Sequence, residues 1–160
     1  KRSGQIGETV LALTPYIAGR PWSLVRFDRR SLFTCDTPVA LVPHPEADAQ
    51  DDHARPGGAG FMTAWGITYP LTRKLGLLMS DPMILADHIT VENVARGELD
   101  HAQQGTTELE RFFNLHTTTN ASEALFHHPD DGRFVPDELP NPTPVTVRMD
   151  GFGAASFLTD

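Results

Sequence analysis

The chain has 160 residues, of which 39% are hydrophobic and 21% charged, as is ordinary for a soluble globular protein. Its 21 acidic side chains outnumber its 13 basic ones, and the net charge of −8 disfavours nucleic-acid binding because it repels a polyanion. No apolar run approaches the roughly 20 residues needed to cross a bilayer, so we expect no membrane protein.

The length predicts one domain over residues 1–160, because a chain of this size can bury a core of its own. The chain begins at Lys1 rather than at a methionine, so we expect it to be a piece of a longer protein. Cys35 is the one cysteine, which excludes an internal disulfide and favours a reducing, cytoplasmic setting.

The first part of the chain predicts a short helix and several strands. Apolar residues at helical spacing from Val10 to Ile17 predict the helix, which Gly19 ends. Residues 22–27 alternate and are rich in strand formers, and a turn at residues 28–30 suggests a hairpin with the next strand. Residues 39–42 are expected to continue the sheet.

The middle of the chain predicts a loop and two more strands. Residues 43–60 are nearly devoid of large apolar side chains and predict an acidic, flexible loop. Strands are predicted at Met62–Tyr69 and Lys74–Met79. The sheet would then be antiparallel, with about four or five strands.

The last part of the chain predicts helices and a connector. Thr90 is expected to cap a helix over residues 91–103 that Gly97 interrupts. A capping box predicts a longer helix of about five turns over Glu108–His128. Residues 132–144 predict a proline-rich connector, followed by a strand-like stretch at 145–149. The fold class is therefore α+β, with an antiparallel sheet packed against one long helix and shorter helices.

An arginine cluster and a histidine pair could each form a functional site, but we interpret both as structural. Arg20, Arg26, Arg29 and Arg30 cluster around a predicted strand, where charged side chains more often discourage strand pairing than form a binding surface. His127 and His128 point about 100° apart on a helix and cannot readily share an ion. Because the common hydrolase, nucleotide and zinc motifs are also absent, we expect no metal and no cofactor.

The predicted long helix turns polar halfway along its inward face. His116, Asn120 and Glu123 fall within one half of the helix, next to its apolar first turn. Buried polar groups without partners cost roughly 1–3 kcal/mol each. These side chains therefore either meet partners across the fold or lie on a part of the helix that projects into water.

Asp36 stands between two predicted strands without its simplest local partner. An aspartate there usually accepts from the backbone N–H two residues on, but that residue is Pro38, which has none. The carboxylate could instead bind the Val39 N–H, an arginine such as Arg73, or water. The alternative is a cleft site shared with the polar helix face.

Three stretches resemble one family. "LFTCDTPVAL" resembles an [ST]-[SC]-D-x-P-V element, "ITYPLTRKLGLLMS" the following P-L-[ST] strand pair, and "FFNLHTTTNASEALFHHPD" an asparagine-containing helix. In this order they resemble the bacterial domain-of-unknown-function family 4238 over residues 8–130. The resemblance implies that Asp36, Pro38, Pro70 and Asn120 occupy motif positions, and that this chain is the C-terminal portion of a longer bacterial protein. It implies no established activity.

These observations predict a ligand- or partner-binding, or regulatory, module with a polar cleft near Asp36 and Asn120. The alternative is a hydrolase-type enzyme that uses Asp36 with His116 or Glu123 as catalytic groups. The expected partner is a small molecule or a protein, the missing N-terminal half included. Neither nucleic acid nor a membrane is expected.

Overall fold

The computed structural model describes residues 11, 13–43, 64–85, 89–136 and 138–139. The predicted acidic loop, apart from Pro43, and the strand-like stretch at 145–149 lie outside these residues. Residues 13–18 are helical, as predicted, and the Gly19 N–H closes the helix on the Pro15 carbonyl at 2.9 Å. Among the described helices, none is long and apolar enough to cross a membrane.

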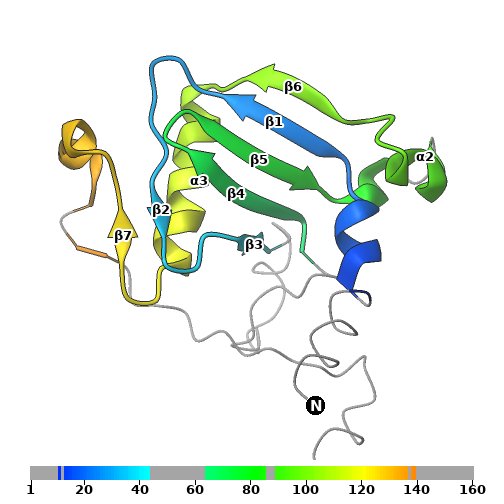
Figure 1. Ribbon diagram of the computed structural model, residues 1–160, viewed down its shortest axis with the longest axis horizontal. Coiled ribbons are helices and arrows are strands. Elements are labelled where there is room, and N and C mark those ends of the chain that lie inside the picture. The colour runs from blue at the N-terminus through cyan, green and yellow to red at the C-terminus, as the bar shows by residue number, and fades with distance from the viewer. Residues whose placement is uncertain (1–10, 12, 44–63, 86–88, 137, 140–160) are drawn as a thin grey trace, which may run out of the picture.

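Five strands form one mixed sheet. They are β1 (Trp22–Arg26), β3 (Ala40–Val42), β4 (Gly66–Thr72), β5 (Leu75–Ser80) and β6 (His101–Gln104), in the order β3-β4-β5-β1-β6. Neighbouring strands are antiparallel except β1 and β6, which are parallel (Figure 1). The predicted mixture of helix and sheet is confirmed, and the prediction of an antiparallel sheet is wrong at β6.

The connection from β5 to β6 explains the parallel pairing. It carries the chain through η1 (Pro82–Leu85) and α2 (Val91–Ala95) to the end of the sheet where β1 begins (Figure 1). There Asp100 accepts the Trp22 N–H at 2.9 Å, so β6 starts beside the start of β1. Thr90 caps α2 as predicted, but Gly97, with φ +77°, leads to a strand instead of more helix.

The predicted hairpin after β1 does not form. β1 pairs instead with β5, which also forms a hairpin with β4. The Phe27 and Leu32 N–H groups bind the carbonyls of Lys74 and Arg73 in the β4–β5 turn, at 2.8 and 2.9 Å. These bonds take the chain across the end of the sheet, where β2 (Thr34–Cys35) pairs with β7 (Leu125–Phe126) in a separate ribbon.

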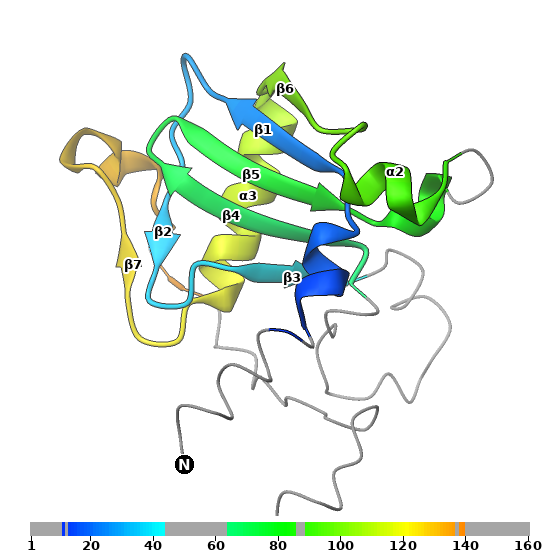
Figure 2. The ribbon, with the colours of Figure 1, turned by 45° about the vertical axis from the view of Figure 1, so that its right-hand side comes forward.

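Helix α3 (Thr107–Asn120) packs on one face of the sheet (Figure 2). Phe113 is fully buried and meets the Phe27 ring edge to face, with 5.9 Å between centroids. Val25 and Leu32 complete this core. Gly76 of β5 leaves room for the Phe113 ring, because a Cβ at Gly76 would lie 2.7 Å from that ring.

The prediction that this helix runs to His128 is wrong. Thr106 caps α3 one residue earlier than expected, and the helix ends at Asn120 because Ala121 is extended, with ψ 127°. Beyond it lie β7 and the 3₁₀ helix η2 (Pro129–Phe134). Of the polar residues considered for the inward face, His116 and Asn120 are half-buried and Glu123 is exposed, so the buried polar residues of α3 are three others. They are Asn114, Thr117 and Thr118.

Candidate functional site

Asp36 joins the end of β2 to the chain that leaves α3. Its carboxylate accepts the backbone N–H groups of Ser122, Glu123 and Ala124 at 3.1, 3.1 and 3.4 Å. Its own N–H donates to the Ala124 carbonyl at 3.2 Å. These amides would otherwise need partners after the last turn of the helix, so Asp36 fixes where α3 ends.

Asn120 makes the complementary set of bonds from the other side. Its amide donates to the carbonyls of Thr37 and Val39, the latter at 3.2 Å, and the Thr37 hydroxyl donates to the Asn120 carbonyl. We call Asp36, Thr37, Asn120 and residues 121–124 the strand–helix clasp. The side chains of Asp36, Thr37 and Asn120 each bind backbone groups, which is the pattern expected when polar side chains hold two loops together.

The clasp favours the ionised form of Asp36. Desolvation raises the pKa of this exposed carboxyl, but the hydrogen bonds from the Ser122, Ala124 and Glu123 amides and from its own N–H outweigh this effect, so the pKa lies below its ordinary value. A carboxylate held in this form is an acceptor and a weak base.

Among the described residues, the side chains of the other two predicted catalytic candidates make no hydrogen bond to this carboxylate. Glu123 is exposed, and it is its backbone N–H that reaches Asp36. The His116 ring packs edge to face on Phe112, with 4.6 Å between centroids, and burial lowers its pKa. Among the described residues, the groups bonded to the Asp36 carboxylate are the three amides.

Cys35 and His127 have ordinary surroundings. Cys35 is buried, with its sulfur 3.9 Å from the Thr37 hydroxyl. The His127 ring packs against Phe33 and contacts the His128 carbonyl at 2.9 Å. Within the described part of the chain, no three His, Cys, Asp or Glu side chains are grouped so as to hold a metal ion.

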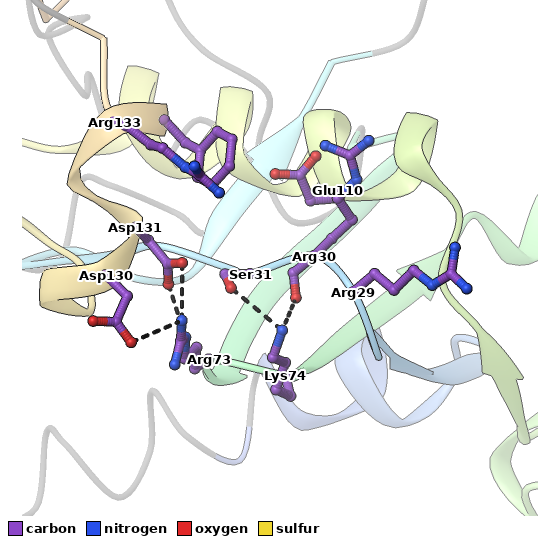
Figure 3. A pocket seen from close by; sticks show the side chains of 10 residues that line it. Arg29, Arg30, Ser31, Arg73, Lys74, Glu110, Asp130, Asp131 and Arg133 are labelled. Carbon is purple, nitrogen blue, oxygen red and sulfur yellow. Dashed lines mark hydrogen bonds and ion pairs between the residues drawn. The ribbon is translucent and has the colours of Figure 1, made fainter.

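A second polar region lies at the end of the sheet beyond the β4–β5 turn, and the sequence did not reveal it. Four segments that are far apart in the chain enclose a cavity of about 240 Å³ there (Figure 3). We call it the basic pocket. It is lined by Arg29, Arg30, Ser31, Arg73, Lys74, Glu110, Asp130, Asp131, Arg133 and Phe134.

The acidic side chains of the basic pocket are already partnered. Asp131 is buried and accepts two bonds from the Arg73 guanidinium, at 2.8 and 2.9 Å, and these bonds are the main reason that its pKa is lowered. Asp130 lies 3.3 Å from the His128 ring and 3.9 Å from Arg73. Glu110 accepts from the Asn114 amide at 2.8 Å.

The loop that carries Arg29 and Arg30 is fastened by its backbone. The Lys74 ammonium donates to the carbonyls of Asp28 and Arg30, at 3.3 and 2.6 Å. On the other side of the loop, the buried Asn114 side chain donates to the Ser31 carbonyl at 3.0 Å. The loop is therefore held in place without the use of its two arginine side chains.

Three cations of the basic pocket remain without a carboxylate partner. In the described ranges, no ion pair involves Arg29, Arg30 or Arg133. Arg133 instead lies over the Phe134 ring, 4.6 Å from its centroid. Figure 3 shows Arg29 and Arg133 on opposite sides of the pocket, with Arg30 between them. The arrangement offers guanidinium donors to an anion.

Part of the basic pocket could have been predicted from the sequence. Arg29 and Arg30 were visible as part of a basic cluster, but the cluster did not stay together, since Arg20 is buried and donates to the Tyr16 and Ala64 carbonyls at 3.0 Å. Arg73 was considered as a partner for Asp36, whereas its carboxylate partner is Asp131. Nothing in the local spacing indicated that these segments would meet.

Comparison with known proteins finds one family. The family model described as "Protein of unknown function (DUF4238)" matches residues 1–131, which is most of the chain and includes the clasp. No curated protein and no solved structure matches the sequence.

Proposed function

Because the chain belongs to the DUF4238 family, whose description assigns no activity, we propose a function from the geometry: the domain binds a small anionic ligand in the basic pocket. The observation that carries the proposal is a set of three guanidinium groups around one cavity, none of which forms an ion pair with a described residue. Binding, rather than catalysis, is the role we assign to the domain.

The charge of the basic pocket supports an anionic ligand. Five basic and three acidic side chains line it, so its net charge is +2 in a chain whose net charge is −8. Guanidinium groups bind carboxylate and phosphate oxygens in pairs through their planar array of donors. The local excess of positive charge therefore selects for an anion although the whole chain is acidic.

The fastening of the loop supports a pocket that is formed before the ligand arrives. Lys74 and Asn114 hold residues 28–31 through the backbone, and the Asp131–Arg73 pair holds η2 on the β4–β5 turn. Ordering a loop on binding reduces affinity, and here folding has already ordered it. The side chains that remain to be ordered are Arg29, Arg30 and Arg133.

We assign a structural role to Asp36 and Asn120 in place of the predicted polar cleft. Bonds from three amides to one carboxylate, and from one amide side chain to two carbonyls, support this assignment. A hydrolase built on Asp36 would need a base and a nucleophile within hydrogen-bond reach. The contacts of His116 and Glu123 give no support to that alternative.

Calorimetric titration with inorganic phosphate at low ionic strength tests the proposal. We expect binding by the unchanged protein and at least tenfold weaker binding by the double variant Arg29→Gln/Arg30→Gln. The matched control is Arg26→Gln/Arg96→Gln, which removes the same charge from two exposed arginines that do not line the pocket. The proposal fails if the unchanged protein does not bind phosphate, or if both double variants bind equally.

A further inference from the structure

We infer that the ligand of the basic pocket is a phosphomonoester of a planar, aromatic group, with its phosphate among Arg29, Arg30 and Arg133 and its ring against Phe134. This inference rests on the proposed function and adds a chemical class to it. It concerns binding only and includes no covalent step.

Charge favours a phosphomonoester over a monocarboxylate. A phosphomonoester carries about −1.5 to −2 at pH 7, whereas a carboxylate carries a single negative charge. The charge of a phosphomonoester therefore matches the net charge of +2 on the pocket lining. This value already includes the three carboxylates of the pocket, each of which has a cation or an amide donor beside it.

The directions of the three arginines also favour a phosphate group. Arg29 and Arg30 come from the loop after β1, and Arg133 comes from η2 on the other side of the cavity (Figure 3). The three terminal oxygens of a phosphomonoester point in different directions and can accept from donors on several sides. The two oxygens of a carboxylate lie in one plane, which suits a single guanidinium.

Phe134 supplies a surface for the organic part of the ligand. Its side chain lines the pocket and is 51% exposed, although it is a large hydrophobic group. The Arg133 guanidinium already lies over this ring. Aromatic rings and guanidinium planes are both surfaces on which a second planar group stacks.

The size of the cavity limits the ligand. Sites for drug-sized molecules occupy roughly 300–1,000 Å³, and this cavity has about 240 Å³. This volume suits one phosphate and one ring, with any larger part of the ligand outside. A polyanion such as nucleic acid remains disfavoured by the net charge of −8.

Calorimetric titrations with phenyl phosphate, methyl phosphate and benzoate test the inference. We expect phenyl phosphate to bind about tenfold more tightly than methyl phosphate, because stacking of one planar group on an aromatic ring is of that order. Benzoate should bind more weakly than either phosphate. Phe134→Leu should remove the preference for phenyl phosphate over methyl phosphate, the two affinities being compared within the same variant.

The control and the contrary outcomes separate this inference from the proposed function. Phe126→Leu removes a ring that is 54% exposed on β7, away from the pocket lining, and should keep the preference. Equal binding of the two phosphomonoesters, or tighter binding of benzoate, overturns the inference and leaves an anion site. Absence of binding by every anion, inorganic phosphate included, overturns the proposed function as well.

Discussion

At the scale of single residues, Asp36 shows how one carboxylate determines the course of two distant segments. Its oxygens take the N–H groups of Ser122 and Glu123, which lie 86 and 87 residues away in sequence. Pro38 removes the local N–H that would compete for the same oxygens. The carboxylate is therefore free for a long-range role, and in the structure this role is to end α3.

Asp36→Asn should lower the melting temperature at pH 7, because one oxygen acceptor becomes an NH₂ group that faces a backbone N–H. Since the folded pKa of Asp36 is depressed, its stabilisation is present above the unfolded pKa, about 4, and is lost as the pH falls through the folded pKa. Melting curves followed by circular dichroism should therefore show a lower melting temperature for Asp36→Asn than for the unchanged protein at pH 7. At pH 2.5 the melting temperatures of the two proteins should be closer together.

Asp28→Asn is the matched control for this substitution. Asp28 is exposed and forms one ion pair, with the exposed Arg26 at 3.4 Å. Loss of an exposed ion pair should leave the melting temperature nearly unchanged. Phosphate affinity should be the same in Asp36→Asn as in the unchanged protein. Loss of phosphate binding with an unchanged melting temperature would place the ligand at the clasp and contradict the structural role of Asp36.

At the scale of the elements, the packing of α3 on β5 depends on a glycine. A Cβ at Gly76 would lie 2.7 and 2.8 Å from two carbons of the buried Phe113 ring and 3.0 Å from Leu32. None of these atoms can move without displacing the core that Phe113 forms with Phe27 and Val25. The close contact of helix and sheet therefore requires that Gly76 has no side chain.

Gly76→Ala should reduce the free energy of unfolding by about 1–3 kcal/mol, the usual cost of overpacking a core. Urea denaturation measures this difference. Gly66→Ala in the neighbouring strand is the control, because its Cβ would meet no atom closer than 3.5 Å and should cost clearly less. Equal losses in the two variants would contradict this account, because contact with the Phe113 ring would then not set the cost.

Sequence patterns predicted the elements that local spacing determines. The alternation around Trp22–Arg26 and the apolar run of β5 gave strands close to their observed bounds. The run from Met62 to Tyr69 also gave a strand, but β4 spans Gly66–Thr72. The end of α3 could not be predicted, because the Asp36 carboxylate that fixes it is remote in sequence. The direction of β6 could not be predicted either, because it depends on where the chain leaves α2 relative to the start of β1.

The residues of the candidate site could also be predicted only in part from the sequence. Asp36 and Asn120 were identified from their positions, and the structure brings both into the clasp. The helical wheel that placed Glu123 beside them extends beyond Asn120, where the helix ends. His116 lies within the helix, but its ring packs on Phe112. The basic pocket is assembled by tertiary contacts, which local spacing does not predict. Asn114 binds the loop at residues 28–31, but the sequence around it shows only that it lies one turn after Glu110.

At the scale of the whole molecule, an acidic chain places a small excess of positive charge at one end of its sheet. The pair formed by Arg73 and the buried Asp131 connects η2 to the β4–β5 turn at that end. The same pair neutralises one carboxylate that would otherwise repel an anion. The pair therefore serves both the stability of the fold and the charge of the basic pocket.

Asp131→Asn should flatten the dependence of stability on acid pH. The Arg73 bonds lower the pKa of Asp131, so the folded state binds fewer protons than the unfolded state between the two pKa values. Stability from this group is present above about pH 4 and is lost as the pH falls through the lowered value. Urea midpoints from pH 7 to pH 2.5 should fall less in Asp131→Asn, and an unchanged slope would contradict the account.

Amide chemical-shift mapping during a phosphate titration tests the central claim most directly, because it locates the ligand without assuming a site. Two-dimensional ¹H–¹⁵N spectra of the unchanged protein should show saturable shifts at residues 28–31, 73–74 and 130–134, with little change at residues 36–39 and 120–124. Shifts centred on the strand–helix clasp, or no saturable shifts at any residue, would contradict the claim that the basic pocket is an anion-binding site.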